Sequence, residues 1–222
     1  MATDARVRRI SVRLLAAAMA VVAMSFAPNG IPTAAAQGCP DIEVIFARGT
    51  NDPPGIGIVG QGFVDALRSK VAPRTVGVYA VNYAATFNFL RAAEGATDAN
   101  NHAQFIANTC PNTKLVLGGF SQGAAVVDLL GGIPPLGNRL GAIGPALPPG
   151  VTPNVAAVAV FGNPSTKFGN PITSAPVFAG RAIDLCKDGD PICSNGRNPF
   201  AHSDYVGAGL AGRAADFVAR LV

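Results

Sequence analysis

The feature that most constrains the fold is an apolar run that ends in a serine between two glycines. Residues 115–123 read Leu-Val-Leu-Gly-Gly-Phe-Ser-Gln-Gly, and the last five match the pattern G-x-S-x-G. Where this pattern forms a nucleophile elbow, a buried strand turns sharply into a helix and the serine hydroxyl projects above the sheet. The flanking residues fit, because 114–118 reads as a buried strand and 122–130 as a helix with an apolar face. Ser121 is therefore a candidate nucleophile, and the alternative is a glycine-rich turn that carries a serine by chance.

The first 36 residues have the three parts of a secretory signal peptide. Four arginines precede an apolar stretch at 14–26, and Ala34-Ala35-Ala36 closes the segment. The apolar stretch is too short to span a bilayer comfortably, so a retained membrane anchor is the less favoured interpretation. We predict cleavage after Ala36, a mature domain at 37–222, and secretion, either into the medium or with retention at the cell envelope.

The basic balance of the chain comes mostly from this leader. Removing four of the 17 basic residues and one of the 13 acidic residues leaves 13 and 12, a net charge of +1. No basic stripe remains that would indicate a nucleic-acid partner. The 186 residues left when 36 are removed from 222 are enough for one domain with a sizeable core, and no repeat or linker divides them.

The order of predicted elements indicates an α/β fold. Apolar runs predict strands at 42–47, 76–81, 114–118, 155–161 and 182–185. Helices are predicted at 60–71, at 99–109 with Asp98 as the cap, at 122–130, and from a cap at Ser203 to near Val222. Residues 133–153, rich in Pro and Gly, are predicted to form a loop. Alternating strands and helices favour a small, about five-stranded, mainly parallel sheet covered on both faces. Together with the elbow motif at 119–123, this predicts a three-layer α/β/α hydrolase fold.

All four cysteines, Cys39, Cys110, Cys186 and Cys193, follow the leader. An even number of cysteines in an exported chain favours disulfides, here two bonds with three connectivities. In one connectivity Cys186 and Cys193 close a short loop, which leaves Cys39 to pair with Cys110. That second bond would fix the first strand beside the entry to the strand that carries Ser121.

A serine hydroxyl needs a base to take its proton, and the chain has only two histidines. His202 follows Ser121, as the base does in α/β hydrolases, whereas His102 precedes it. His102 lies in the polar stretch Asn-Asn-His-Ala-Gln, which predicts a solvent-facing side chain. His202 is therefore the candidate base.

The acid that orients the base must lie between Ser121 and His202, and four aspartates qualify. Asp128 lies two turns along the predicted helix, which would carry it away from the serine, and the facing of Asp184 within a strand is uncertain. Asp188 and Asp190 lie between Cys186 and Cys193, where a closed loop would hold a carboxylate with little freedom. Spacing alone does not separate these two.

Four segments in this order resemble the cutinase family, and most closely its bacterial secreted cutinase-like esterases. They are Phe46-Ala47-Arg48-Gly49-Thr50, residues 119–123, the loop 186–193 with Gly189-Asp190 inside it, and the histidine that follows. By position, the resemblance implies that Ser121 is the nucleophile, Asp190 the acid and His202 the base, while Asp188 does not match. It also implies disulfides between Cys39 and Cys110 and between Cys186 and Cys193.

The oxyanion formed during acyl transfer needs hydrogen-bond donors. Elbow geometry supplies one in the backbone N–H of Gln122, the residue after the nucleophile. The resemblance implies a second contribution from Thr50, at a position where fungal cutinases carry serine. The additional methyl group of threonine restricts its rotamers.

Two other signals are weaker. Residues 55–60 match G-x-G-x-x-G, but the glycines follow the strand at a distance and the second strand ends in Val-Asn-Tyr, without a carboxylate for a ribose. A helix-entry loop is the favoured interpretation. Two distant histidines and paired cysteines leave no ligand set for a metal, so we expect no metal and no cofactor.

An apolar cluster lies near the predicted site in the sequence: Phe87, Phe89, Leu90 and, next to His202, Phe200. Core packing is the first interpretation of such residues. The alternative is an exposed acyl rim beside the serine that meets acyl chains or a lipid surface.

These patterns and the resemblance together predict a secreted serine esterase that acts on short to medium acyl esters through an acyl-enzyme. The expected partner is an ester or lipid substrate, with transient contact to a lipid surface, and the chain is expected to be a monomer. Two alternatives remain: an envelope acyltransferase that uses the same acyl-enzyme, and a non-catalytic lipid-binding surface antigen. An intact Ser121, Asp190 and His202 set speaks against the second.

Overall fold

The computed structural model describes residues 38–138 and 143–222. The predicted signal peptide at 1–36 and its cleavage site lie outside the described residues. Gly38–Val222 form one compact unit. Within the part of the chain that is described, no helix combines the length and the apolar character needed to cross a membrane.

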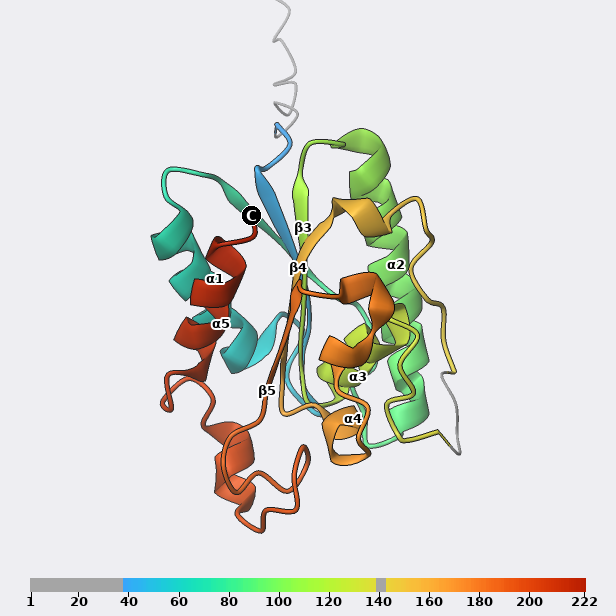
Figure 1. Cartoon of the computed structure of the whole chain (residues 1–222), viewed down its shortest axis with the longest axis vertical. Helices are drawn as coiled ribbons and strands as arrows, with labels where there is room; N and C mark the ends of the chain where they lie inside the picture. Colours follow the sequence, from blue (N-terminus) through green and yellow to red (C-terminus); the bar gives the residue numbers. More distant parts are fainter. Residues whose placement is uncertain (1–37, 139–142) are drawn as a thin grey trace, which may run out of the picture. The chain divides into compact units, whose positions relative to one another are not determined.

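Five parallel strands form a single sheet in the described residues, in the order β2-β1-β3-β4-β5 (Figure 1). The strands are β1 (Ile42–Ala47), β2 (Val76–Ala80), β3 (Lys114–Phe120), β4 (Val155–Phe161) and β5 (Ala182–Leu185). All six residues of β1 are buried, whereas every residue of the edge strand β2 is partly exposed. This burial explains why the central strands read as continuous apolar runs, since both of their faces are covered.

Helices cover both faces of the sheet, as Figure 1 shows with α1 and α5 on one side and α2 and α3 on the other. The α-helices are α1 (Gly57–Val71), α2 (Ala92–Thr109), α3 (Gln122–Leu130), α4 (Pro164–Lys167) and α5 (Leu210–Ala219). Short 3₁₀ helices are η1 (Phe89–Arg91), η2 (Thr152–Asn154), η3 (Ile172–Ser174), η4 (Pro176–Phe178) and η5 (Pro199–Ser203). Side chains of alternate strand residues pack into two separate cores. Phe46, for example, packs on the side of α1 and α5, and Ile45 on the side of α2 and α3. The predicted three-layer α/β fold is confirmed.

The strand order positions the site. The chain runs outward from β1 to β2 and then returns to place β3 on the other side of β1. The segments that leave the carboxyl ends of β1 and β3 therefore diverge, and this is the kind of topological switch point at which open α/β sheets bind their ligands. The register aligns Ala47 with Gly119, so the segments that carry Thr50 and Ser121 start side by side.

Several predicted helix ends differ from the structure. Helix α1 begins at Gly57 rather than residue 60, and α2 begins at Ala92 rather than residue 99. Asp98 is therefore not a cap: its carboxylate accepts hydrogen bonds from the Tyr79 hydroxyl and from the backbone N–H of Asn82. The last helix begins at Leu210, after Gly209 in the left-handed conformation, and Ser203 belongs to η5 instead.

Candidate active site

The turn between β3 and α3 has the geometry of a nucleophile elbow. Ser121 has a φ of 56° and a ψ of −117°, a backbone conformation that non-glycine residues rarely adopt and that costs energy. A Cβ at Gly119 would lie 2.1 Å from the Gly123 carbonyl oxygen, and one at Gly123 would lie 1.9 Å from that of Ala47. Both glycines are therefore required for the backbones to approach, and the serine hydroxyl projects from the strained turn.

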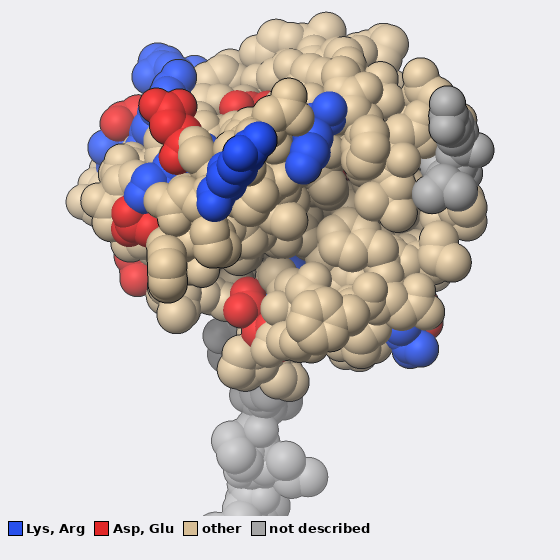
Figure 2. Space-filling view, turned by 90° about the horizontal axis from the view of Figure 1, so that it is seen from below, with Lys and Arg blue, Asp and Glu red and all other residues tan. Residues whose placement is uncertain are grey.

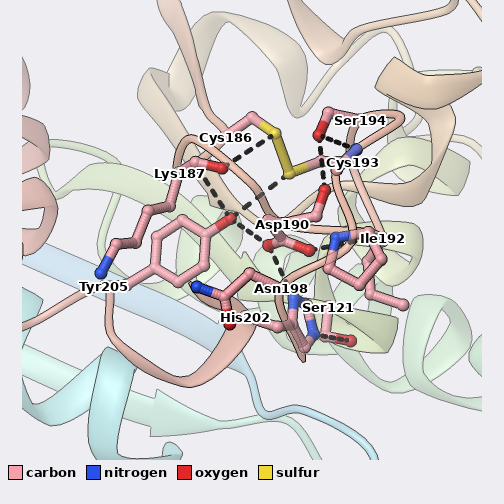
Figure 3. Close-up of polar contacts among 12 residues, drawn as sticks. Ser121, Cys186, Lys187, Asp190, Ile192, Cys193, Ser194, Asn198, His202 and Tyr205 are labelled. Atoms are coloured by element: carbon pink, nitrogen blue, oxygen red, sulfur yellow. Dashed lines mark hydrogen bonds and ion pairs between the residues drawn. A yellow bond between two sulfur atoms is a disulfide. The ribbon is translucent and has the colours of Figure 1, made fainter. Parts of the chain in front are cut away.

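The structure brings the three residues predicted from the resemblance into one hydrogen-bonded series. The Oγ atom of Ser121 lies 2.9 Å from Nε2 of His202, and Nδ1 of His202 lies 2.8 Å from Oδ2 of Asp190. Ser121 comes from the β3–α3 turn, Asp190 from the loop after β5, and His202 from η5 (Figure 3). A histidine with a carboxylate at Nδ1 carries its proton there, which leaves Nε2 free to accept from the serine.

Asp190 is completely buried and is held by three donors. Besides His202, the Tyr205 hydroxyl donates to Oδ2 at 2.6 Å, and the backbone N–H of Ile192 donates to Oδ1 at 2.7 Å. Burial by itself raises the pKa of Asp190, but the hydrogen bonds from His202, Tyr205 and Ile192 outweigh it, and the pKa lies below its ordinary value. The carboxylate is therefore kept ionised.

A disulfide closes the loop that carries this carboxylate. Cys186 and Cys193 are bonded at 2.05 Å, with a Cα–Cα distance of 5.7 Å. Inside the loop, Asp188 is exposed while Asp190 is buried, so only Asp190 faces the histidine. Spacing in the sequence does not distinguish the two as candidate acids, because the direction of each side chain depends on the conformation of the turn.

The second disulfide joins Cys39 and Cys110, with a Cα–Cα distance of 5.5 Å. It lies just before β1 and just after α2, at the entry to β3. The described residues therefore contain both bonds that the resemblance implies and no free cysteine. In the chain-entropy model a bond that closes a loop of this length stabilises the fold by about 4 kcal/mol.

Aromatic packing holds the imidazole of His202 in place. The Phe120 ring stacks on it, with centroids 4.8 Å apart and planes at 28°. On another side is Gly162, which has a φ of 58° and where a Cβ would lie 2.8 Å from Cε1 of His202. A glycine is needed here because β4 ends directly against the imidazole.

The predicted oxyanion residues lie together at the carboxyl ends of β1 and β3. Thr50 Oγ1 donates to Oε1 of the buried Gln122 side chain at 3.4 Å. No carbonyl in the described chain accepts from the backbone N–H of Gln122, as expected for the first residue of a helix. The backbone N–H of Gln122 is therefore available to donate to an oxyanion. The Thr50 hydroxyl can do so only after it breaks its hydrogen bond to the Gln122 side chain.

Sequence reasoning missed the residues that hold the Thr50 loop. Arg48 is buried, and its guanidinium donates to the carbonyls of Asp52 at 2.9 Å and Tyr83 at 2.7 Å. In return, the Tyr83 hydroxyl donates to the Arg48 carbonyl. The only sequence signal was a charged residue directly after a mostly apolar strand.

The apolar cluster near the site divides into two kinds. Phe87 and Phe200 are each 81% exposed and Leu90 is 59% exposed, so core packing, the first interpretation, is wrong for these three. Phe89 is partly buried and packs against the core beneath α2 and α3. Figure 2 looks onto the face toward which the strand carboxyl ends point, and most of the surface seen there is uncharged.

His102 is not solvent-facing, and that prediction is wrong. Its side chain is only 16% exposed, its ring stacks on Tyr79 at 3.6 Å, and Nε2 lies 3.0 Å from a carboxylate oxygen of Glu43. The polar neighbours of His102 in the sequence concealed this contact, because Glu43 lies on β1, far away along the chain. His102 belongs to the packing between α2 and the sheet and lies outside the Ser121 site.

Two further aspartates lie apart from the triad, Asp128 buried and Asp184 partly buried. Nδ2 of Asn163 donates to Asp128 at 3.0 Å and to Asp184 at 2.9 Å. Burial raises the pKa of both carboxyl groups, and within the described residues Oδ2 of Asp128 and Oδ1 of Asp184 have no hydrogen-bond partner. The hydrogen bonds of these residues link α3, α4 and β5, and none of them involves Ser121.

No group of three or more His, Cys, Asp or Glu side chains in the described residues could hold a metal ion. The chemistry available at the site is that of a serine, a histidine and an ionised carboxylate in series. On this fold the arrangement defines a serine hydrolase of the α/β-hydrolase class.

Comparison with known proteins identifies the family. The cutinase family model matches residues 38–222, and the chain belongs to this family. The chain is 49% identical over 207 residues to phospholipase Culp4 of Mycobacterium tuberculosis, an alignment that covers 93% of this chain and 89% of that one. It is 52% identical over 192 residues to the probable carboxylesterase Culp3 of the same organism, with 84% and 71% covered.

A solved structure supports the same assignment. Trichoderma reesei cutinase, in complex with a phosphonate inhibitor, superposes with a TM-score of 0.66 at 34% identity over 82% of this chain and 77% of the other. The protein is accordingly a cutinase-like carboxylic ester hydrolase, as the sequence patterns predicted.

Proposed function

We propose that Ser121 is the nucleophile, His202 the general base and Asp190 the acid of a Ser-His-Asp acyl-enzyme mechanism. One observation carries the proposal: His202 bridges the Ser121 hydroxyl at 2.9 Å and the Asp190 carboxylate at 2.8 Å. Both distances are those of good hydrogen bonds. All three residues belong to one chain, so we expect a monomer to be active.

The proposed reaction has two halves. In the first, Ser121 Oγ attacks the ester carbonyl carbon while its proton passes to Nε2 of His202, and the tetrahedral adduct collapses as that proton moves to the departing alcohol. In the second, water attacks the acyl carbonyl carbon while His202 takes a proton from the water, and the adduct collapses as His202 passes that proton to Ser121 Oγ and the carboxylic acid leaves. Asp190 remains ionised and stabilises the imidazolium in both halves.

The backbone N–H of Gln122 is the proposed main donor to the oxyanion. Its position at the first turn of α3 adds the positive end of the helix dipole. Thr50 is the proposed second contributor, through its backbone N–H or through its hydroxyl once that leaves Gln122. Such a donor typically contributes about 3 to 4 kcal/mol to transition-state stabilisation.

The proposed substrates are short to medium acyl esters that are presented by a lipid or another apolar surface. Phe87, Leu90 and Phe200 support this. Exposing three large apolar side chains to water costs free energy, and contact with an apolar partner would recover it. The names of two relatives, a phospholipase and a carboxylesterase, point to the same range of esters. We further propose export through the leader at 1–36, with cleavage after Ala36, since the two disulfides suit an oxidising compartment.

Labelling with a fluorophosphonate tests the nucleophile. The wild-type protein and a Ser174→Ala variant should be labelled and should hydrolyse p-nitrophenyl butyrate, whereas Ser121→Ala should do neither. Ser174 is a suitable control because it is an exposed serine whose hydroxyl donates to the Pro171 carbonyl, away from the site. Persistent labelling of Ser121→Ala would overturn the assignment.

A further inference from the structure

A buried tyrosine lies beside the Asp190–His202 pair. Tyr205 has no exposed surface, and its hydroxyl lies 2.6 Å from Oδ2 of Asp190 (Figure 3). The same oxygen lies 2.8 Å from Nδ1 of His202. Two donors therefore share one carboxylate oxygen, and one of them is the proposed base.

The direction of each hydrogen bond around the phenol is fixed. The backbone N–H of Lys187 lies 3.2 Å from the Tyr205 oxygen and can only donate to it. An ionised carboxylate can only accept, so the phenol proton is donated to Asp190. The sulfur of Cys193, 3.4 Å away, is a much weaker partner. The Tyr205 hydroxyl thus accepts a hydrogen bond from the Lys187 backbone and donates one to the Asp190 carboxylate.

The ring has little freedom to turn away from this position. Phe120 meets it edge-on at 5.6 Å and Phe161 at 6.0 Å, with interplanar angles of 62° and 83°. Phe120 also stacks on His202, so the tyrosine and the imidazole are packed against one side chain. Rigid aromatic packing of this kind keeps the hydroxyl aimed at Oδ2.

We propose that Tyr205 is a positioning residue of the catalytic site, which fixes the Asp190 carboxylate and limits how strongly that carboxylate attracts the proton on His202. The proposal rests on the triad of the proposed function. A hydrogen bond from the phenol delocalises part of the negative charge of Oδ2, so less of it acts on the imidazolium. Without the phenol, His202 would hold its proton more tightly and would be a poorer proton donor to the leaving alcohol.

The charged side chains near Asp190 and His202 are paired with other groups, so the Tyr205 hydroxyl is the contact of Asp190 that a substitution can change. Lys187 and Asp204 form an ion pair with each other through their side chains. Asp184, on β5, is partly buried, and its carboxylate already accepts hydrogen bonds from Asn163 and Thr166. The pKa of Tyr205 is raised by burial and by the hydrogen bond to Asp190, so the phenol keeps its proton throughout the working range.

The test is the pH profile of Tyr205→Phe, which removes the hydroxyl and keeps the ring. We expect kcat/KM to fall about tenfold with KM little changed. The acidic limb of the profile should move to higher pH by about half a unit. Tyr79→Phe is the matched control, because it removes a tyrosine hydroxyl that donates to the Asp98 carboxylate away from the Ser121 site, and its acidic limb should stay at the wild-type position.

A direct titration separates this proposal from the proposed function. The chain has two histidines, so NMR of protein with ¹³C-labelled histidine gives two signals, which His102→Gln assigns. The His202 midpoint should rise in Tyr205→Phe, and fluorotyrosine at position 205, a stronger donor of the same shape, should lower it. Midpoints and acidic limbs that do not move, or move the other way, would overturn the role of Tyr205 even if Ser121→Ala is inactive. If Ser121→Ala stays active, the triad fails instead, while the NMR titration still reports the contact.

Discussion

Gly162→Ala is the change that most sharply tests how the histidine is held. Gly162 directly follows β4 and has a φ of 58°, and a Cβ there would lie 2.8 Å from Cε1 and 3.0 Å from Nδ1 of His202 and 3.1 Å from the Tyr205 hydroxyl. The imidazole must retreat by about 0.6 Å to restore an ordinary carbon–carbon contact near 3.4 Å. A shift of that size stretches the 2.9 Å contact with Ser121 to the limit of a hydrogen bond.

Two effects of different size follow from this substitution. An alanine held in the left-handed conformation costs about 1–2 kcal/mol of stability. The displaced base costs much more activity, and we expect kcat/KM to fall about 100-fold, since misplacement near 1 Å has an effect of that order. The protein should therefore remain folded, with a slightly lower Tm, while it loses most of its esterase activity.

Gly180→Ala separates the two effects. Gly180 also has a positive φ, of 73°, but a Cβ there would meet nothing within 4 Å. It should lose a similar amount of stability in urea unfolding and keep near wild-type hydrolysis of p-nitrophenyl butyrate. If Gly162→Ala keeps more than a third of the activity, or if the two variants lose activity equally, the argument from the close approach to His202 is wrong.

Two further predictions concern the surface and the core. Phe87→Ser and Phe200→Ser should reduce hydrolysis of aggregated esters several-fold more than hydrolysis of soluble ones. The control Phe105→Ser, at an exposed position near the far end of α2, should change neither. Equal losses on both kinds of ester would refute the lipid-contact role. Asp128→Asn should raise the free energy of unfolding more at pH 8 than at pH 5, as measured by urea titration. The reason is that burial raises the folded-state pKa of Asp128 above its unfolded value, so the stability that the wild-type carboxyl contributes is present at low pH and is lost as the pH rises toward that raised pKa. A gain that is the same at both pH values, or larger at pH 5, would contradict this.

The strands and the elbow were predictable from the sequence because their signals are local. The helix predicted at 122–130 matches α3, since the apolar run, the glycines and the serine all specify the same turn. The start of α2 was not predictable from local pattern. Residues 92–98 include Gly95, where a Cβ would strike Val126 of α3, so this part of the helix is specified by packing rather than by periodicity.

The parts of the site that escaped prediction depend on distant partners. His102 faces Glu43 on β1, and Tyr205 shares a carboxylate oxygen with His202, yet neither pairing leaves a trace in the neighbouring residues. The choice between Asp188 and Asp190 needed the family resemblance, because local spacing fits both. A sequence read alone specifies which residue types are present, while the direction of a side chain within a loop depends on the whole fold.

The loop that holds Asp190 has a consequence for how the enzyme fails. Asp190 and His202 lie on one segment that is closed upon itself by the Cys186–Cys193 bond and by the Asn198 N–H to the Gly189 carbonyl at 2.9 Å. Ser121, in contrast, is built into the central sheet. The active site thus joins a locally closed loop segment to a turn of the central sheet, within one compact unit. We therefore expect that a local rearrangement of this loop abolishes activity while the sheet and the nucleophile stay intact.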